Sequence, residues 1–180
     1  ELEPGNASFY YHRGVTYSAV GKIQESIDDY TNAIDLDPEY EDALNNRGHH
    51  YWMLKQIPEA ISDFTKAIEI ETGLKKIESY IKRAHSYNQL KNHQKAIEDY
   101  TQSIAINPQN QGAYHNRGII YAERGQIEKA LSDVSRAIEL NPLDGIAYYN
   151  RGKIYQVFGM NEESNADLQK SQELLSNQQE

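Results

Sequence analysis

The 180-residue chain has no cysteine, and several other residue types are scarce: it has one tryptophan, two methionines and five prolines. Without cysteine the chain forms no disulfide bond and offers no thiol chemistry. This composition fits a reducing cytosol, so we expect a cytoplasmic protein, while an exported domain built without disulfide bonds stays open.

Long apolar runs are also missing from the sequence. No stretch approaches the roughly 20 apolar residues needed to span a bilayer. The first ten residues, which include Glu1, Glu3 and Pro4, do not resemble a signal peptide. We therefore expect no insertion into a membrane.

Positive charge is in the minority. The chain has 27 acidic residues against 18 lysines and arginines, which gives a formal net charge of −9. An acidic surface repels phosphate backbones, so we expect no nucleic acid partner.

Signatures of catalysis are absent as well. The sequence contains no glycine-rich phosphate loop, no Ser-His-Asp signature and no HExxH pattern. Carboxylates are plentiful, but they fall on helix faces that we expect to be solvated. The sequence therefore predicts no catalytic residue, no cofactor and no enzyme activity within these residues.

What the chain does contain is one short string, Arg-Gly-x-x-Tyr, which occurs four times, and once more as a variant with alanine. The arginines that begin these strings are 34, 36, 34 and 34 residues apart. Self-similarity at a period of this size marks a solenoid of stacked repeats.

The period divides the chain into five repeats, each numbered from position 1 to position 34. They cover residues 7–40, 41–74, 77–110, 111–144 and 145–178. Lys75 and Lys76 are an insertion, which we expect to lengthen a helix or loop between the second and third repeats. Because Pro4 lies 34 residues before Pro38, residues 1–6 read as the tail of a preceding repeat. We expect a fragment of a longer array, able to self-associate through its truncated N-terminal face.

Small residues recur at positions 8, 20 and 27 of the repeats, and large ones at positions 11 and 24. Position 8 holds Gly14, Gly48, Ala84, Gly118 and Gly152. Glycine inside a helix costs about 1 kcal/mol relative to alanine, so a recurring glycine indicates that two helices approach closely there. Glycine at position 15 and proline at position 32 mark a turn and the end of a second helix. Each repeat is therefore predicted to be a helix, a tight turn and a second helix.

Every repeat also has an arginine at position 7 and an aspartate at position 23. Their recurrence predicts an ion pair between the two helices of each repeat; a bridge from the aspartate of one repeat to the arginine of the next stays open. The predicted pairs are Arg13 with Asp29, Arg47 with Asp63, Arg83 with Asp99, Arg117 with Asp133, and Arg151 with Asp167.

The period, the small residues, the tyrosine at position 11 and the proline at position 32 resemble the tetratricopeptide repeat over residues 7–178. The Asn-Arg-Gly form is similar to the type common in bacteria and archaea. The resemblance implies an all-α fold, a right-handed superhelical α-solenoid of helix-turn-helix repeats. From residue 161 onwards the leucines persist but serines replace alanine at packing positions, which predicts a polar C-terminal capping helix.

In this family the first helices line a concave groove. The residues that the resemblance places there, as partner-binding residues, are Tyr11, His12, Asn45, Asn46, His49, Trp52, Lys82, His85, His115, Asn116, Tyr149, Asn150 and Lys153. Amide side chains bond the N–H and C=O groups of an extended peptide, while aromatic rings contact its side chains. We expect a non-catalytic scaffold that binds a partner peptide or helix. A homotypic assembly module, or a regulatory region of a larger multidomain protein, is the alternative.

Several details of the groove stay open. Asn46, Asn116 and Asn150 share position 6, where related domains grip a peptide backbone, but an asparagine there is equally compatible with a tolerated polar residue. Trp52 is either a groove anchor or a packing residue between the second and third repeats. The two-lysine, two-asparagine, one-arginine clamp of members that bind chaperone C-termini is absent.

Three histidines, His49, His85 and His115, fall on neighbouring first helices. A zinc site needs three or four ligands that converge at about 2.1 Å, and nothing in the sequence shows such closeness. We expect solvated groove histidines and no metal site.

Overall fold

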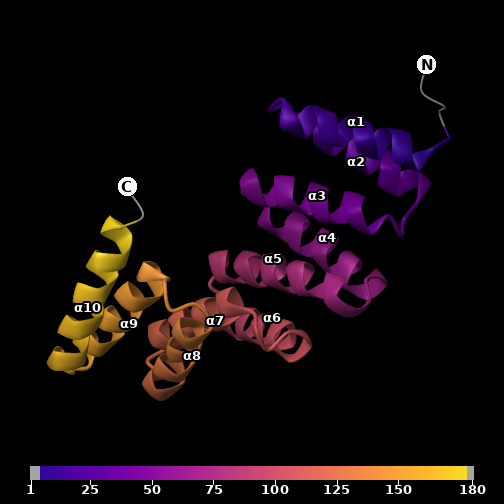
Figure 1. The fold of residues 1–180 in the computed structure, drawn as a ribbon. Helices are drawn as coiled ribbons and strands as arrows, with labels where there is room; N and C mark the ends of the chain where they lie inside the picture. Colours follow the sequence, from indigo (N-terminus) through magenta and orange to yellow (C-terminus); the bar gives the residue numbers. More distant parts are fainter. Residues whose placement is uncertain (1–4, 178–180) are drawn as a thin grey trace. The chain divides into compact units, whose positions relative to one another are not determined.

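The computed structural model describes residues 5–177, and all regular structure within that range is helical. The α-helices are α1 (Ala7–Ala19), α2 (Ile23–Leu36), α3 (Glu41–Met53), α4 (Ile57–Ile70), α5 (Lys76–Gln89), α6 (His93–Ile106), α7 (Gln111–Glu123), α8 (Ile127–Leu140), α9 (Gly145–Val157) and α10 (Asn161–Ser176) (Figure 1). The prediction of an all-α, helix-turn-helix fold is confirmed. Pro4, on which the expected preceding repeat depends, lies outside the described residues.

The chain forms two compact parts, residues 1–99 and residues 100–180, each described by itself. Helix α6 passes from the first part to the second. In the first part, α1 packs on α2 and α3 on α4, and these pairs stack through contacts of α2 with α3 and of α4 with α5. In the second part, α7 packs on α8 and α9 on α10, and α8 contacts α9. Each pair therefore buries its apolar faces against its own partner and against the next pair.

Glycine at position 8 lets the two helices of a repeat approach. A Cβ atom added to Gly48 would lie 2.9 Å from Cε1 of Phe64, and one added to Gly118 would lie 2.7 Å from Cγ2 of Val134. Phe64 and Val134 stand at position 24 and are buried. The predicted match of a small residue on the first helix with a larger one on the second is confirmed.

The turns between first and second helices use the left-handed backbone region at position 15. Gly21, Gly125 and Gly159 have φ of +76°, +69° and +73°, as predicted for glycines that end a helix. Lys55 and Lys91 occupy the same position with φ of +64° and +58°. An L-residue with a side chain is disfavoured in this region, so these two turns keep the geometry of the glycine turns at some cost in stability.

The insertion between the second and third repeats forms a short 3₁₀ turn, Gly73–Lys75, which leads directly into α5. Gly73 has φ of +58°, and Leu74 is 71% exposed. The two extra residues therefore lengthen the connection, as the sequence predicted.

The five predicted ion pairs all form within their own repeats. In each, Nε and Nη2 of the arginine donate to the two carboxylate oxygens of the aspartate, at 2.6–2.9 Å. The aspartates are buried, with relative exposures of 2–6%. This two-point geometry fixes the angle between the first and second helix of a repeat as well as neutralising the buried charge.

The remaining nitrogen of four of these arginines reaches the preceding repeat. Nη1 of Arg47 donates to the hydroxyl of Thr31 at 3.0 Å, and Nη1 of Arg151 donates to that of Ser135 at 3.0 Å. Arg83 and Arg117 make the same bond to Thr65 and Thr101. A hydroxyl at position 25 therefore links the ion pair of one repeat to the second helix of the repeat before it.

Candidate functional site

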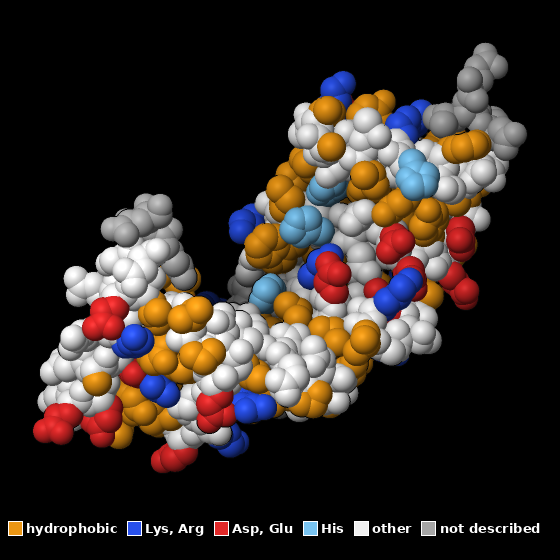
Figure 2. Space-filling model, viewed as in Figure 1, with side chains coloured by type: hydrophobic (Ala, Val, Ile, Leu, Met, Phe, Trp, Pro, Cys, Tyr) orange, Lys and Arg blue, Asp and Glu red, His pale blue; other side chains and the backbone are white. Residues whose placement is uncertain are grey.

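Four of the predicted groove residues meet around one cavity in the N-terminal part. His49 and Trp52 come from α3 and Lys82 and His85 from α5, while Phe64 of α4 completes the lining. The cavity has a volume of about 150 Å³. Figure 2 shows histidine side chains among hydrophobic ones on this face of the N-terminal helices. We call this cavity the aromatic pocket.

Aromatic rings and lysine side chains determine the character of this pocket. The rings of His49 and Trp52 are stacked, with centroids 6.1 Å apart and planes at 11°. Nζ of Lys55 lies 5.3 Å from the Trp52 ring centroid, and Nζ of Lys82 lies 6.0 Å from that of Phe64. The flat faces of these rings therefore already lie next to positive charge.

The pKa values of the two imidazoles of the aromatic pocket are both lowered. Burial lowers the pKa of His85, and burial together with the positive charge of Lys82 lowers the pKa of His49, against a smaller opposing effect of Glu78. Lys82 is paired with the exposed Glu78, with Nζ 2.7 Å from Oε1. The uncharged form of each imidazole is therefore favoured near pH 7.

The C-terminal part has a cavity at corresponding positions of its repeats, which we call the aliphatic pocket. Its volume is about 260 Å³, and its lining is Ile119, Ala122, Asn150, Lys153, Ile154, Val157 and Phe158. Both pockets have lining residues at the same repeat positions. These are positions 9 and 12 of one repeat and positions 6 and 9 of the repeat that follows it. Val157 is 74% exposed and Phe158 44%, so apolar surface is available here as well.

Several of the predicted polar residues bond within the chain. Nδ2 of Asn46 donates to the hydroxyl of Tyr11 at 3.4 Å, and the amide nitrogen of Asn150 lies 2.8 Å from Nε2 of His115. Burial is the main cause of the lowered pKa of His115. These amides therefore join the first helices of adjacent repeats, and a peptide backbone would have to displace the present partners.

Asn45 belongs to a buried polar network at the junction of the second and third repeats. Its Nδ2 donates to Oε1 of Glu71 at 2.7 Å, and the hydroxyl of Ser79 lies within 3.0 Å of both Oε1 of Glu71 and Oδ1 of Asn45. Glu71 is 4% exposed, and burial raises the pKa of its carboxyl group. Asn45 thus stabilises this junction in the structure. The repeat pattern did not predict roles for Glu71 and Ser79. The one signal in the sequence is a carboxylate directly after the second helix of the second repeat, close to the insertion.

The other predicted residues lie apart from the two pockets. Tyr11 packs against Tyr40 with ring centroids 4.9 Å apart. His12 is exposed, and its ring lies edge-on to that of Tyr11, with centroids 5.2 Å apart and planes at 65°. Asn116 is half-buried on α7. Tyr149 lies on α9 beside α10.

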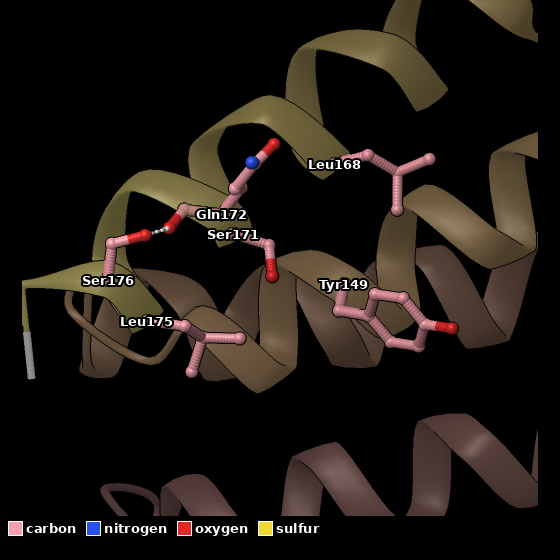
Figure 3. Close-up of a pocket in the computed structure, with 6 residues that line it drawn as sticks. All are labelled: Tyr149, Leu168, Ser171, Gln172, Leu175 and Ser176. Carbon is pink, nitrogen blue, oxygen red and sulfur yellow. Dashed lines mark hydrogen bonds between the residues drawn. The ribbon is translucent and has the colours of Figure 1, made fainter. Parts of the chain in front are cut away.

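A further depression of about 360 Å³ lies on α9 and α10, lined by Tyr149, Leu168, Ser171, Gln172, Leu175 and Ser176 (Figure 3). The exposed positions of α10 are mostly polar, and Gln172 takes position 28, where the other repeats have isoleucine. Leu175 packs on α9, because a Cβ atom added to Gly145 would lie 2.8 Å from its Cγ. The surface formed by α9 and α10 therefore combines polar side chains with a mainly apolar depression.

Two kinds of site are not found among residues 5–177. No group of three or more histidine, cysteine, aspartate or glutamate side chains in this range is placed to hold a metal ion. Within the same range, no helix is both long enough and apolar enough to cross a membrane.

Comparison with known structures gives the same fold. The crystal structure of MamA protein is 23% identical over 93% of this chain and 91% of that chain, with a TM-score of 0.86. A MamA from Desulfovibrio magneticus RS-1, from residue 41 to its end, is 17% identical with 97% of each chain covered and a TM-score of 0.89. YrrB, described as a TPR protein with an unusual peptide-binding site, is 22% identical over 96% of this chain and 88% of that chain, with a TM-score of 0.79. At these identities the likeness shows the fold alone.

Comparison by sequence gives the family. A search of curated proteins finds no match. Sequence models described as tetratricopeptide repeat or TPR repeat match residues 7–40, 41–72, 77–110, 99–132 and 120–157. These matches extend over most of the chain, and the helix pairs, the position-8 glycines and the turn geometry agree with them. The chain belongs to the tetratricopeptide repeat family.

Proposed function

We propose that the chain is a protein-interaction scaffold that binds a partner peptide or helix on the surface of its first helices, without chemistry of its own. The observation that carries this proposal is the aromatic pocket: four side chains chosen from their repeat positions, His49, Trp52, Lys82 and His85, line one cavity. Mainly apolar pockets with a few convergent polar groups are typical of binding sites, and this one is of a size for a single side chain.

The aliphatic pocket supports the same function. It lies between α7 and α9 at the repeat positions that form the aromatic pocket between α3 and α5. A peptide that placed one apolar side chain in either pocket would leave its backbone beside the polar groups of neighbouring first helices. Among proteins with this fold, YrrB is described as having a peptide-binding site, so the architecture accommodates this function.

The bonds between Asn46 and Tyr11 and between Asn150 and His115 fit this proposal as exchangeable contacts. Both are partly buried and link side chains of adjacent first helices. An arriving peptide carbonyl or amide would replace one neutral hydrogen bond with another, which costs little net free energy. Specificity would then come mainly from the side chains that enter the pockets.

The test is selection of peptides from a random display library on the intact chain, followed by measurement of affinity for the selected peptides. Trp52→Ala is expected to weaken binding at least about tenfold, because a buried tryptophan anchor typically carries a large share of binding energy. Lys66→Ala, on the exposed side of α4, is the matched control and is expected to bind normally. Failure to select any peptide, or equal binding by both variants, would contradict the proposal.

A further inference from the structure

We propose that the aromatic pocket takes a single aromatic side chain of the partner, in preference to an aliphatic one. This inference rests on the proposed function, since it names the group that the partner presents to the pocket. The size of the pocket, its walls and its difference from the aliphatic pocket support this preference.

The size of the pocket suits a single ring. Its volume is about 150 Å³, and a buried cavity of about 150 Å³ lined by apolar side chains is known to admit benzene. A phenylalanine or tyrosine ring therefore fits, whereas an extended stretch of several residues does not. The pocket is an anchor point within a longer contact surface.

The walls of the pocket favour an aromatic ring over an aliphatic group of similar size. A ring that enters meets the indole of Trp52, the imidazoles of His49 and His85, and the ring of Phe64 at the base. Ring pairs gain from offset or edge-to-face contact beyond the burial of apolar area. An aliphatic side chain would gain the burial alone.

Lys82 adds a second reason for this preference. Its side chain is 23% exposed and its Nζ already lies 6.0 Å from the Phe64 ring centroid. A ring bound against Phe64 would come within reach of the same ammonium group, which is attracted to the face of an aromatic ring. The contribution at such partly exposed sites corresponds to about a two- to fivefold gain in affinity.

The aliphatic pocket has a similar position but different walls. Most of its lining is aliphatic and comes from Ile119, Ala122, Ile154 and Val157. The one aromatic side chain in the lining is that of Phe158. Nζ of Lys153 donates to Oε1 of Gln156 at 2.6 Å, so its ammonium group is engaged with an amide. The structure therefore assigns the preference for an aromatic group to the aromatic pocket alone.

Trp52 makes this assignment measurable, because it is the only tryptophan among 14 tyrosines and three phenylalanines. Excitation at about 295 nm reports on the indole and avoids tyrosine. The probes are N-acetyl-phenylalaninamide, N-acetyl-leucinamide and N-acetyl-alaninamide, titrated into the intact chain. We expect the phenylalanine probe to shift Trp52 emission saturably, with an apparent Kd about threefold or more below that of the leucine probe. The alanine probe is expected to have no effect.

Lys82→Met keeps the aliphatic stem and removes the charge. It is expected to reduce the difference between the phenylalanine and leucine probes to less than about twofold, while Lys66→Met on α4 leaves that difference unchanged. If Lys82→Met does not fold, as judged by circular dichroism, the ratio measured on the unaltered chain decides. Equal or tighter binding of the leucine probe, or no response of Trp52 to any probe, would overturn the inference.

The two proposals fail in distinguishable ways. Selected peptides that depend on Trp52 but tolerate replacement of their aromatic residues by leucine would leave the proposed function intact and contradict the aromatic preference. Binding of the phenylalanine probe without any selectable peptide would support the pocket chemistry and contradict the scaffold function.

Discussion

Arg47 illustrates how single residues stabilise this array. Two of its nitrogens bind Asp63 at 2.8 Å, and the third binds Thr31 of the preceding repeat at 3.0 Å. The arginine side chain is 12% exposed and that of Asp63 is 4% exposed, whereas Arg13 of the first repeat is 40% exposed. Removing one member of a buried pair leaves the other charge uncompensated, so the cost depends on burial.

The first prediction concerns this pair. Arg47→Leu is expected to lower the free energy of unfolding by about 3 kcal/mol, and Asp63→Tyr in the same chain is expected to recover much of that loss. Arg13→Leu also leaves a buried carboxylate, that of Asp29, without its partner, but it is expected to cost less than Arg47→Leu, because Arg13 is more exposed and its charge is partly screened by water. Urea denaturation of the single and double variants measures these values. Additive losses in the double variant would show that Arg47 and Asp63 are energetically independent.

The second prediction concerns the turn residue Lys91, which has φ of +58°. Lys91→Gly is expected to raise the free energy of unfolding by about 0.5–1 kcal/mol, because relief of left-handed strain exceeds the entropy that glycine adds to the unfolded chain. Lys66→Gly, in the middle of α4, serves as the control and is expected to lower stability by about 1 kcal/mol. A thermal melt in which Lys91→Gly is destabilised would be inconsistent with a strained turn.

At the scale of helices, close approach of the first and second helix determines what position 8 tolerates. Gly118 on α7 has Cγ2 of Val134 at 2.7 Å and the carbonyl oxygen of Ala130 at 3.2 Å from the site of an added Cβ atom. Gly112, also on α7, has only the side-chain oxygen of Asn110 nearby, at 3.8 Å. One helix therefore contains a crowded glycine and an uncrowded one.

The third prediction uses this contrast. Gly118→Ala is expected to destabilise the chain by about 1–2 kcal/mol, since overpacking outweighs the gain in helix propensity. Gly112→Ala is expected to leave stability unchanged or to raise it by up to about 0.5 kcal/mol. Chemical denaturation compares the two variants directly. Similar stabilities for both would mean that α7 and α8 are free to move apart.

The sequence predicted these elements because the repeat makes packing periodic. Three features recur along the chain: the glycine at position 8, the turn at position 15 and an ion pair like that of Arg47 with Asp63. Each could therefore be predicted from several repeats independently. A hydroxyl also recurs at position 25, which is the sequence signal for the hydrogen bond from Arg47 to Thr31. Predicting that bond from the signal requires knowing how one repeat packs on the next.

The candidate site was predictable only in part. The family resemblance placed His49, Trp52, Lys82 and His85 in the groove, but it did not predict the cavity between them, whose volume depends on how Phe64 fills the space beside Gly48. The network around Asn45 was not predictable, because periodicity shows which way a side chain points and not which hydrogen bonds it makes. A hydrogen-bond network that occurs at a single junction between repeats leaves no periodic pattern in the sequence from which it could be predicted.

At the scale of the whole molecule, histidines with lowered pKa values make stability depend on pH. Burial lowers the pKa of His50, which stacks on Tyr30 and bonds Ser26 through Nε2 at 3.1 Å. The pKa values of His49, His85 and His115 are lowered as well. Below the unfolded value near 6.5, the unfolded chain binds more protons than the folded chain, so folding becomes less favourable as pH falls. The raised pKa of Glu71 acts in the opposite direction, because its protonated form is favoured in the folded state.

The fourth prediction follows from these signs. Stability is expected to fall between about pH 7 and pH 5.5, with a slope of at most about 1.4 kcal/mol per pH unit for each histidine. His50→Gln keeps a partner for Ser26 and removes one titrating group, so its stability is expected to depend less steeply on pH. Denaturation at several pH values measures both slopes. Identical slopes would exclude His50 as a contributor.

The central claim is that a partner is held on the first helices. It is tested most directly by nuclear magnetic resonance mapping of a selected peptide on the isotope-labelled chain. We predict that the largest shift changes fall on His49, Trp52, Lys82 and His85, with further changes along α7 and α9. Changes confined to the second helices α2, α4 and α8, with the side chains of the aromatic pocket unperturbed, would contradict the account.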